Sequence, residues 1–67
     1  MTKTIVVVFN DWVSVEEIDN FLEDYNLEGT KTSSVNKKYV IEIPVREENK
    51  YKQIFKNNKF VQKVFWA

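Results

Sequence analysis

The stretch Thr4–Phe9 reads TIVVVF and is the most continuous apolar segment of this 67-residue chain. β-branched residues dominate it, and no polar residue interrupts the run from Ile5 to Phe9. A strand with one face in water alternates between apolar and polar residues, whereas a strand that is covered on both faces does not. The segment therefore predicts a covered strand in the middle of a sheet.

A helix is predicted after a short turn at residues 10–12. Ser14 and Glu17 have the spacing of a capping box, in which each side chain bonds the backbone amide of the other residue. Val13 and Ile18 occupy the positions of a hydrophobic staple. We expect the helix to run from about residue 15 to about residue 25 and to stop before Gly29. Its apolar stripe consists of Val15, Ile18, Phe21, Leu22 and Tyr25.

A hairpin is predicted in the middle of the chain. Thr30–Val35, TKTSSV, is polar but β-capable, which is typical of a weak edge strand. The turn is expected at residues 36–37 or 36–38, because Asn tolerates positive φ. Lys38–Pro44, KYVIEIP, alternates as a half-buried strand does, and Pro44 ends it because proline cannot donate to a ladder.

A second helix and a last strand complete the chain. Glu47–Asn57 predicts a helix whose buried face consists of Tyr51, Ile54 and Phe55, and Phe60–Trp66, FVQKVFW, predicts a strand. The order β-α-β-β-α-β predicts an α+β, ferredoxin-like sandwich as a single domain over residues 1–67, with a four-stranded antiparallel sheet and both helices on one face. The first and third strands are the most apolar, and this fold places those two in the middle.

The composition excludes several classes of function. Ten basic and ten acidic residues cancel, so no net field attracts nucleic acid or an anionic membrane. The chain has no Cys and no His, which removes disulfides, thiol chemistry, the usual zinc ligands and the commonest acid–base side chain. No apolar run is long enough to span a bilayer. We therefore expect a protein that is not an enzyme, uses no cofactor or metal, and binds neither nucleic acid nor membrane.

The charge is unevenly distributed along the chain. Residues 1–30 hold one lysine and seven acidic residues, whereas residues 31–67 hold nine basic and three acidic residues. One interpretation is an acidic first helix that lies beside a basic second helix and attracts it across solvent. The alternative is a bipolar surface that orients a partner.

The predicted sheet has a face that the two helices leave uncovered. Val6 and Val8 alternate with Ile5, Val7 and Phe9, so both faces of the first strand are apolar. An open face of this kind is typical of a docking surface for a protein partner. The candidate partner-binding residues are Val6, Val8, Val40, Glu42, Val64, Phe65, Trp66 and Ala67.

An RNA-recognition motif is an alternative with the same strand order. Its first and third strands present aromatic side chains for base stacking. Residues 37–41, KKYVI, only loosely resemble the third-strand signature, because the glycine and the second aromatic residue are absent. Tyr39 is therefore interpreted as a core or sheet-face residue.

Taken as one string, the chain resembles the prodomains of subtilisin-like serine proteases and the stand-alone inhibitors related to them. The resemblance begins with a strand of type IVxF and continues through a helix that reads VSVEEIDNFL over residues 13–22. A polar strand, the strand Tyr39–Pro44 (YVIEIP), a lysine-rich helix, and a closing segment with Val61 and Val64 three apart follow in the same order. The resemblance covers nearly the whole chain.

The resemblance implies a mode of action. In this family the open sheet face packs on two parallel surface helices of the protease, and acidic side chains cap the N-termini of those helices. The residues after the last strand enter the substrate cleft, and the domain assists folding of the protease and then inhibits it. Family members continue there with acidic and proline-containing residues, whereas this sequence has Phe65-Trp66-Ala67. These residues either form a shortened tail, or the inhibitory tail is absent.

Two other functions stay open at this point. One is a small interaction protein without a protease partner, such as a phage-encoded inhibitor of a host complex. The other is weak self-association through the open face or an edge strand. No secretory signal is evident, so a cytoplasmic location is expected, or a secreted one if the chain is an excised prodomain.

Phe65 and Trp66 are adjacent in a strand, so their side chains are expected on opposite faces. We predict that Phe65 is mainly structural and that Trp66 is mainly an anchor for a partner.

Overall fold

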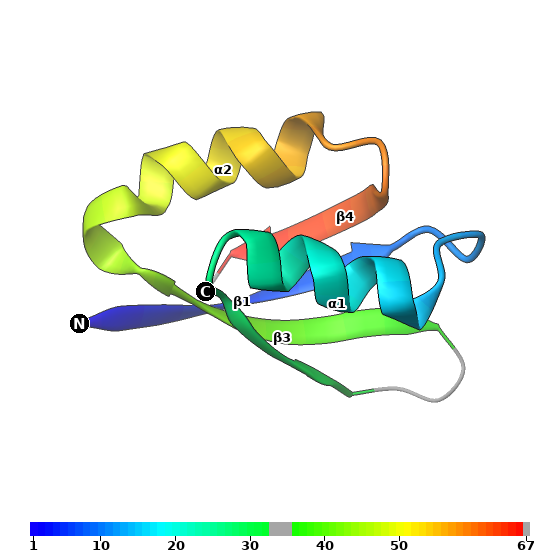
Figure 1. Ribbon diagram of the computed structural model, residues 1–67. Coiled ribbons are helices and arrows are strands. Elements are labelled where there is room, and N and C mark those ends of the chain that lie inside the picture. Colours follow the sequence, from blue (N-terminus) through cyan, green and yellow to red (C-terminus); the bar gives the residue numbers. More distant parts are fainter. Residues whose placement is uncertain (33–35, 67) are drawn as a thin grey trace.

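The computed structural model describes residues 1–32 and 36–66. Along the chain, the elements are β1 (Thr2–Phe9), α1 (Val15–Asp24), β2 (Glu28–Lys31), β3 (Lys37–Pro44), a 3₁₀ turn η1 (Val45–Glu47), α2 (Glu48–Asn57) and β4 (Val61–Trp66). The strands form one antiparallel sheet in the order β2-β3-β1-β4, and Figure 1 shows both helices on the same side of it. The predicted ferredoxin-like α+β fold is confirmed.

The core lies between the sheet and the two helices. Ile5, Val7 and Phe9 of β1 have no exposed surface, and their neighbours on β3 face the same way. Aromatic rings connect the two helices, with the centroids of Phe21 and Phe55 5.9 Å apart. The other buried residues are Val13, Ile18, Phe21, Leu22, Leu27, Tyr39, Ile41, Ile43, Tyr51 and Phe55. This aromatic packing gives a chain without disulfides a core.

The start of α1 has the predicted cap. The Ser14 Oγ accepts a hydrogen bond from the Glu17 amide at 3.1 Å, and the Glu17 carboxylate accepts one from the Ser14 amide at 3.3 Å. Both residues of the predicted staple, Val13 and Ile18, are fully buried. Two other residues of the predicted stripe, Val15 and Tyr25, are more exposed, at 41% and 37%.

The end of α1 agrees with the sequence-based expectation, whereas the position of β2 does not. Asn26, with φ of 54°, supplies the left-handed residue that ends the helix, and Gly29 lies inside β2 instead. A Cβ at Gly29 would lie 2.7 Å from Leu22 Cδ1 and 3.2 Å from Ile41 Cγ1, so a larger residue there would require the Leu22 side chain to shift. The predicted strand Thr30–Val35 is therefore placed too late, and its residues 33–35 lie outside the described chain.

Strand β4 contains a β-bulge that changes which side chains face the helices. Phe9 pairs with Val61 and Val8 pairs with Lys63, so Gln62 is an extra residue in β4. As a result Val61 and Val64, three residues apart, both pack against the core. The bulge also determines the orientation of the last residues of the strand.

Candidate protein-binding surfaces

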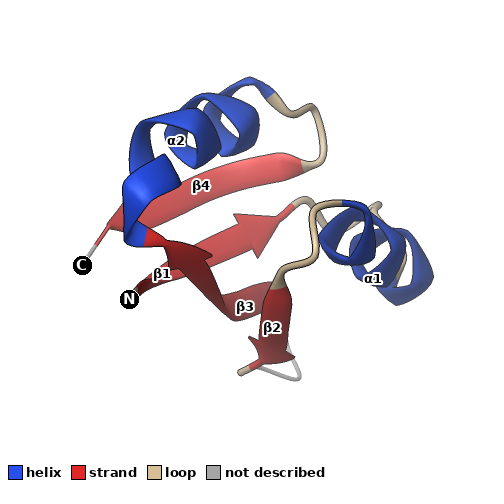
Figure 2. Cartoon of the chain, turned by 60° about the vertical axis from the view of Figure 1, so that its left-hand side comes forward, coloured by secondary structure: helices blue, strands red, loops and turns tan. Residues whose placement is uncertain are grey.

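The sheet has one face that no described element covers, as Figures 1 and 2 show. We call it the open face; by register and strand alternation it consists of Thr4, Val6, Val8, Glu28, Thr30, Lys38, Val40, Glu42, Lys63 and Phe65. The predicted central position of β1 is confirmed. The expectation that β1 is covered on both faces is wrong. No part of residues 1–32 and 36–66 covers its second face, and Val6 and Val8 remain partly exposed there.

An apolar row crosses the middle of the open face. Val6 pairs with Val40 on one side and with Phe65 on the other, so the three side chains lie side by side across β3, β1 and β4. The Phe65 side chain is 52% exposed, the largest exposure of any apolar residue in this row. A row of this kind offers area that a partner can bury.

Opposite charges lie at the two ends of the apolar row. Toward one end, Val8 pairs with Lys38 and with Lys63. Toward the other end, Glu42 pairs with Glu28, which places two carboxylates opposite each other on neighbouring strands. Like charges in this arrangement repel each other unless a cation or a positive dipole lies between them. The open face is therefore electrically polarised along the strands.

The structure gathers five of the eight predicted partner-binding residues on the open face: Val6, Val8, Val40, Glu42 and Phe65. Val64 and Trp66 do not join them, because they pair with the buried Val7 and Ile5 and pack against the core. Ala67 lies outside the described residues. The predicted orientation of the two terminal aromatic residues is thus reversed, since Phe65 is the exposed one and Trp66 is the one that contacts the core.

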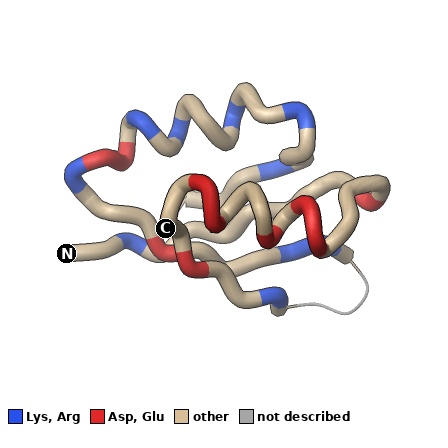
Figure 3. The backbone as a smooth tube through the Cα atoms, viewed as in Figure 1, with Lys and Arg blue, Asp and Glu red and all other residues tan. Residues whose placement is uncertain are grey.

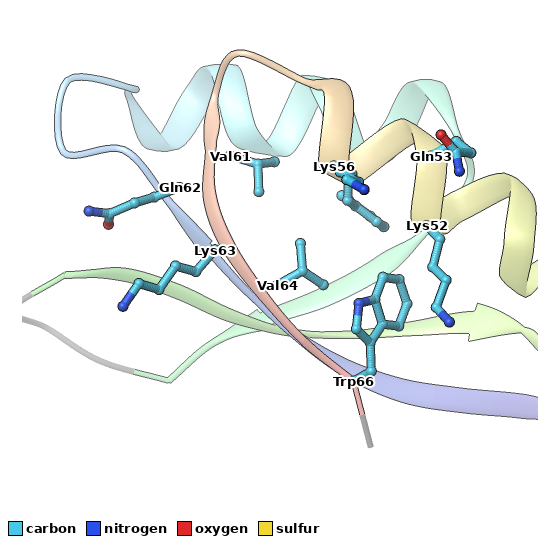
Figure 4. A pocket seen from close by; sticks show the side chains of 9 residues that line it. Lys52, Gln53, Lys56, Val61, Gln62, Lys63, Val64 and Trp66 are labelled. Carbon is cyan, nitrogen blue, oxygen red and sulfur yellow. The ribbon is translucent and has the colours of Figure 1, made fainter.

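A second surface, which the sequence did not suggest, lies between α2 and β4. It is a groove of about 450 Å³ lined by Lys52, Gln53, Phe55, Lys56, Val61, Gln62, Lys63, Val64 and Trp66. Figure 4 shows Val61, Val64 and Trp66 from β4 facing Lys52 and Lys56 from α2. The Lys52 ammonium lies 5.3 Å from the centre of the Trp66 ring. The sequence feature that could have indicated this groove is the pair Lys52 and Lys56, four residues apart on the helix that precedes the edge strand.

An exposed aromatic pair lies at the end of the sheet where β1 leads into α1. The Trp12 side chain is 64% exposed and packs edge-on against Phe60, with ring centroids 5.6 Å apart. The Asn10 amide nitrogen donates to the Phe60 carbonyl at 2.8 Å, which holds the two loops together. From the sequence, Trp12 is predicted only as part of a turn.

The helices carry opposite charge, with acidic residues along α1 and basic residues along α2, as Figure 3 shows. Their contact is aromatic: besides Phe21 and Phe55, the rings of Tyr25 and Tyr51 lie 6.3 Å apart. Within residues 1–32 and 36–66, neither ion pair joins the helices, since Lys3 binds Glu48 at 2.7 Å and Lys50 binds Glu47 at 3.9 Å. The acidic helix does lie beside the basic helix, but no direct bridge connects them.

The position of Tyr39 bears on the RNA-binding alternative. Tyr39 is 3% exposed and faces the helices, not the open face. Burial raises the pKa of its phenol above the ordinary value of 10.0, and the negative charge of Asp19 adds to this effect. The open face presents valines on β1 and β3 where an RNA-recognition motif presents stacking aromatic residues.

Comparison with known proteins gives no match: no family model matches the chain, and no curated protein and no solved structure is significantly similar to it. The likeness to protease prodomains therefore stays a prediction. Neither described helix has the length and apolarity needed to cross a bilayer.

Proposed function

We propose that this chain is a non-catalytic protein-binding domain that inhibits, or assists the folding of, a subtilisin-like serine protease through its open face. The observation that carries the proposal is the apolar row Val6–Val40–Phe65 on a sheet face that no described element covers. Burial of such a row is favourable at about 25 cal/mol per Å² of apolar surface.

The acidic end of the open face favours a partner that presents positive charge to it. Glu28 and Glu42 lie opposite each other and lack a cation within ion-pair distance among the described residues. The N-terminus of a helix carries a partial positive charge and free amide donors, and it is a favourable neighbour for a carboxylate pair. The resemblance to protease prodomains implies a contact of the same kind, in which acidic side chains of the domain cap protease helices, and we propose Glu42 for that role.

The size of the open face sets the expected strength of binding. Neighbouring strands lie about 4.8 Å apart and each residue adds about 3.3 Å along a strand, so four strands of these lengths present a face of roughly 400 Å². A stable interface buries about 800 Å² on each partner. The partner must therefore also contact residues outside this face, and two copies stacked only through this face should associate weakly.

The test is inhibition of a subtilisin-type protease that hydrolyses a small peptide substrate. We expect slower hydrolysis at about 10 μM protein, which corresponds to about −7 kcal/mol of binding free energy. The chaperone role is tested in parallel by the yield of active protease after refolding with and without the domain. Unchanged hydrolysis together with an unchanged yield contradicts the proposal.

Two charge-reversal variants locate the contact. Glu42→Lys turns the Glu28–Glu42 repulsion into an attraction, so it should leave the domain folded while it weakens inhibition. Glu23→Lys makes the same change of charge on the exposed surface of α1, near a helix C-terminus that favours cations. Inhibition that survives Glu42→Lys but not Glu23→Lys would assign the contact to the helix side.

A further inference from the structure

The groove between α2 and β4 combines an apolar floor with a free strand edge. Val64 and Trp66 pack against the core from β4 and line the groove together with Val61. β4 is the last strand of the sheet, so its outer backbone groups have no neighbouring strand within the described chain. A free edge beside an apolar groove is the arrangement that accepts an extended peptide as an additional strand.

The charge around the groove is positive. Lys52 and Lys56 lie one turn apart on α2, and the structure places no carboxylate of residues 1–32 and 36–66 within 4 Å of either ammonium group. Glu48 interacts with Lys52 at longer range, but its carboxylate accepts its hydrogen bond from the Lys3 ammonium. Figure 4 shows Lys63 extending to the other side of β4 from Trp66, so both sides of the edge strand have a lysine nearby.

We propose that the groove and the outer edge of β4 bind an extended acidic peptide segment of another protein. The segment adds to the sheet beside β4, and its backbone pairs with the free edge. An apolar side chain of the segment packs on Val64 and Trp66, and carboxylates reach Lys52 and Lys56. This contact lies on a different surface from the open face, so it does not depend on the proposed function.

The probe is a fluorescein-labelled synthetic peptide of alternating glutamate and valine, followed by fluorescence anisotropy with the full chain. Its alternation lets either residue type face the groove. We expect saturable binding below about 1 mM, which corresponds to about −4 kcal/mol. The absence of saturable binding in that range overturns the proposal.

Matched double variants test the role of the groove lysines. The double variant Lys52→Glu with Lys56→Glu replaces both groove lysines with acidic residues, so it should raise the Kd for the acidic peptide about tenfold or more. The control double variant Lys31→Glu with Lys59→Glu makes the same change of net charge at exposed sites outside the groove and should change Kd less than about twofold. Equal losses in the two double variants would show non-specific attraction and overturn the proposal. Thermal melting of all variants checks that they are folded.

A second probe tests the strand pairing. A peptide with the same side chains and N-methyl groups on alternate amides cannot donate along one edge, so we expect it to bind about tenfold or more weakly. Equal binding of the two peptides overturns the strand-addition model. Oligothymidine is tested in the same way. If it binds more tightly than the acidic peptide, and if the Lys52 and Lys56 variants abolish that binding, the groove is assigned to nucleic acid. A dimer of the chain that the same variants abolish would assign it to a second copy, and either result contradicts the proposal.

Discussion

Replacement of Trp66 by alanine should destabilise the domain more than replacement of Phe65. Trp66 pairs with Ile5, packs against the core, and has the Lys52 ammonium 5.3 Å from its ring centre. Phe65 lies on the open face with 52% of its surface exposed. The two side chains are adjacent in the same strand, so each variant is a control for the other.

The magnitude follows from the area that each ring removes from water. A buried aromatic side chain covers about 150–250 Å², and each Å² contributes about 25 cal/mol. Trp66 is largely covered, so Trp66→Ala should lower the free energy of unfolding by about 3 kcal/mol, near the lower end of the range for core aromatic residues. Phe65 is half exposed, so Phe65→Ala should lower the free energy of unfolding by only about 1 kcal/mol, since alanine keeps part of the covered area and the unfolded chain is itself partly compact.

Thermal unfolding followed by circular dichroism measures the difference. For a domain of this size, 1 kcal/mol corresponds to a shift in Tm of about 4–8 °C, so Trp66→Ala should melt roughly 8–16 °C below Phe65→Ala. Since small domains have only about 3–5 kcal/mol of stability, Trp66→Ala should be near its unfolding transition at room temperature. A Phe65→Ala variant that melts as low as Trp66→Ala, or lower, would refute the assigned orientation of β4.

Three other perturbations probe the local structure. Gly29→Ala places a Cβ 2.7 Å from Cδ1 of the buried Leu22, which must then shift, so urea unfolding should show a loss of about 1–2 kcal/mol, whereas Thr30→Ala in the same strand should change stability by less than about 0.5 kcal/mol. Ser14→Ala removes the cap of α1 and should cost about 1 kcal/mol in the same assay, while Ser14→Asp, which keeps an acceptor, should cost much less; equal losses would show that the cap contributes nothing. The pKa of Glu48 is lowered from 4.5, mainly by the hydrogen bond from Lys3, so the folded state binds fewer protons and stability should fall as the pH drops below 4.5. Lys3→Met should reduce that loss in acid-unfolding curves, and an unchanged acid limb would contradict the role of this pair.

The central elements were predictable because local sequence and global fold agree there. The valine run of β1, the alternation of β3 and the capping box of α1 each favour one conformation, and the packing supports the same one. The position of β2 was not predictable, because it is set by the pairing of residues 28–31 with residues 39–42 of β3, which is a tertiary contact. The sequence favoured residues 30–35 on β propensity alone, and packing selected residues 28–31.

The candidate surface was predictable in its centre but not at its rim. Alternation along β1 and β3 correctly separated Val6 and Val40 from the core residues. In β4, uninterrupted alternation from Val61 would turn Phe65 toward the helices, but the extra residue Gln62 reverses the faces beyond it. The one local sign of the bulge is the spacing of Val61 and Val64, which are three residues apart and so break the period of two. The groove beside α2 was missed for a related reason, because it exists only once β4 is at the edge of the sheet.

We propose that the open face is the surface that docks on a subtilisin-like protease. It is tested most directly by amide chemical shifts of the isotope-labelled domain, titrated with an active-site-blocked subtilisin-type protease. We expect the largest shifts or line broadening at Val6, Val40, Glu42 and Phe65, with little change along α1 and at the groove lysines Lys52 and Lys56. Perturbations that cluster on the helices and leave β1 and β3 unchanged would contradict it.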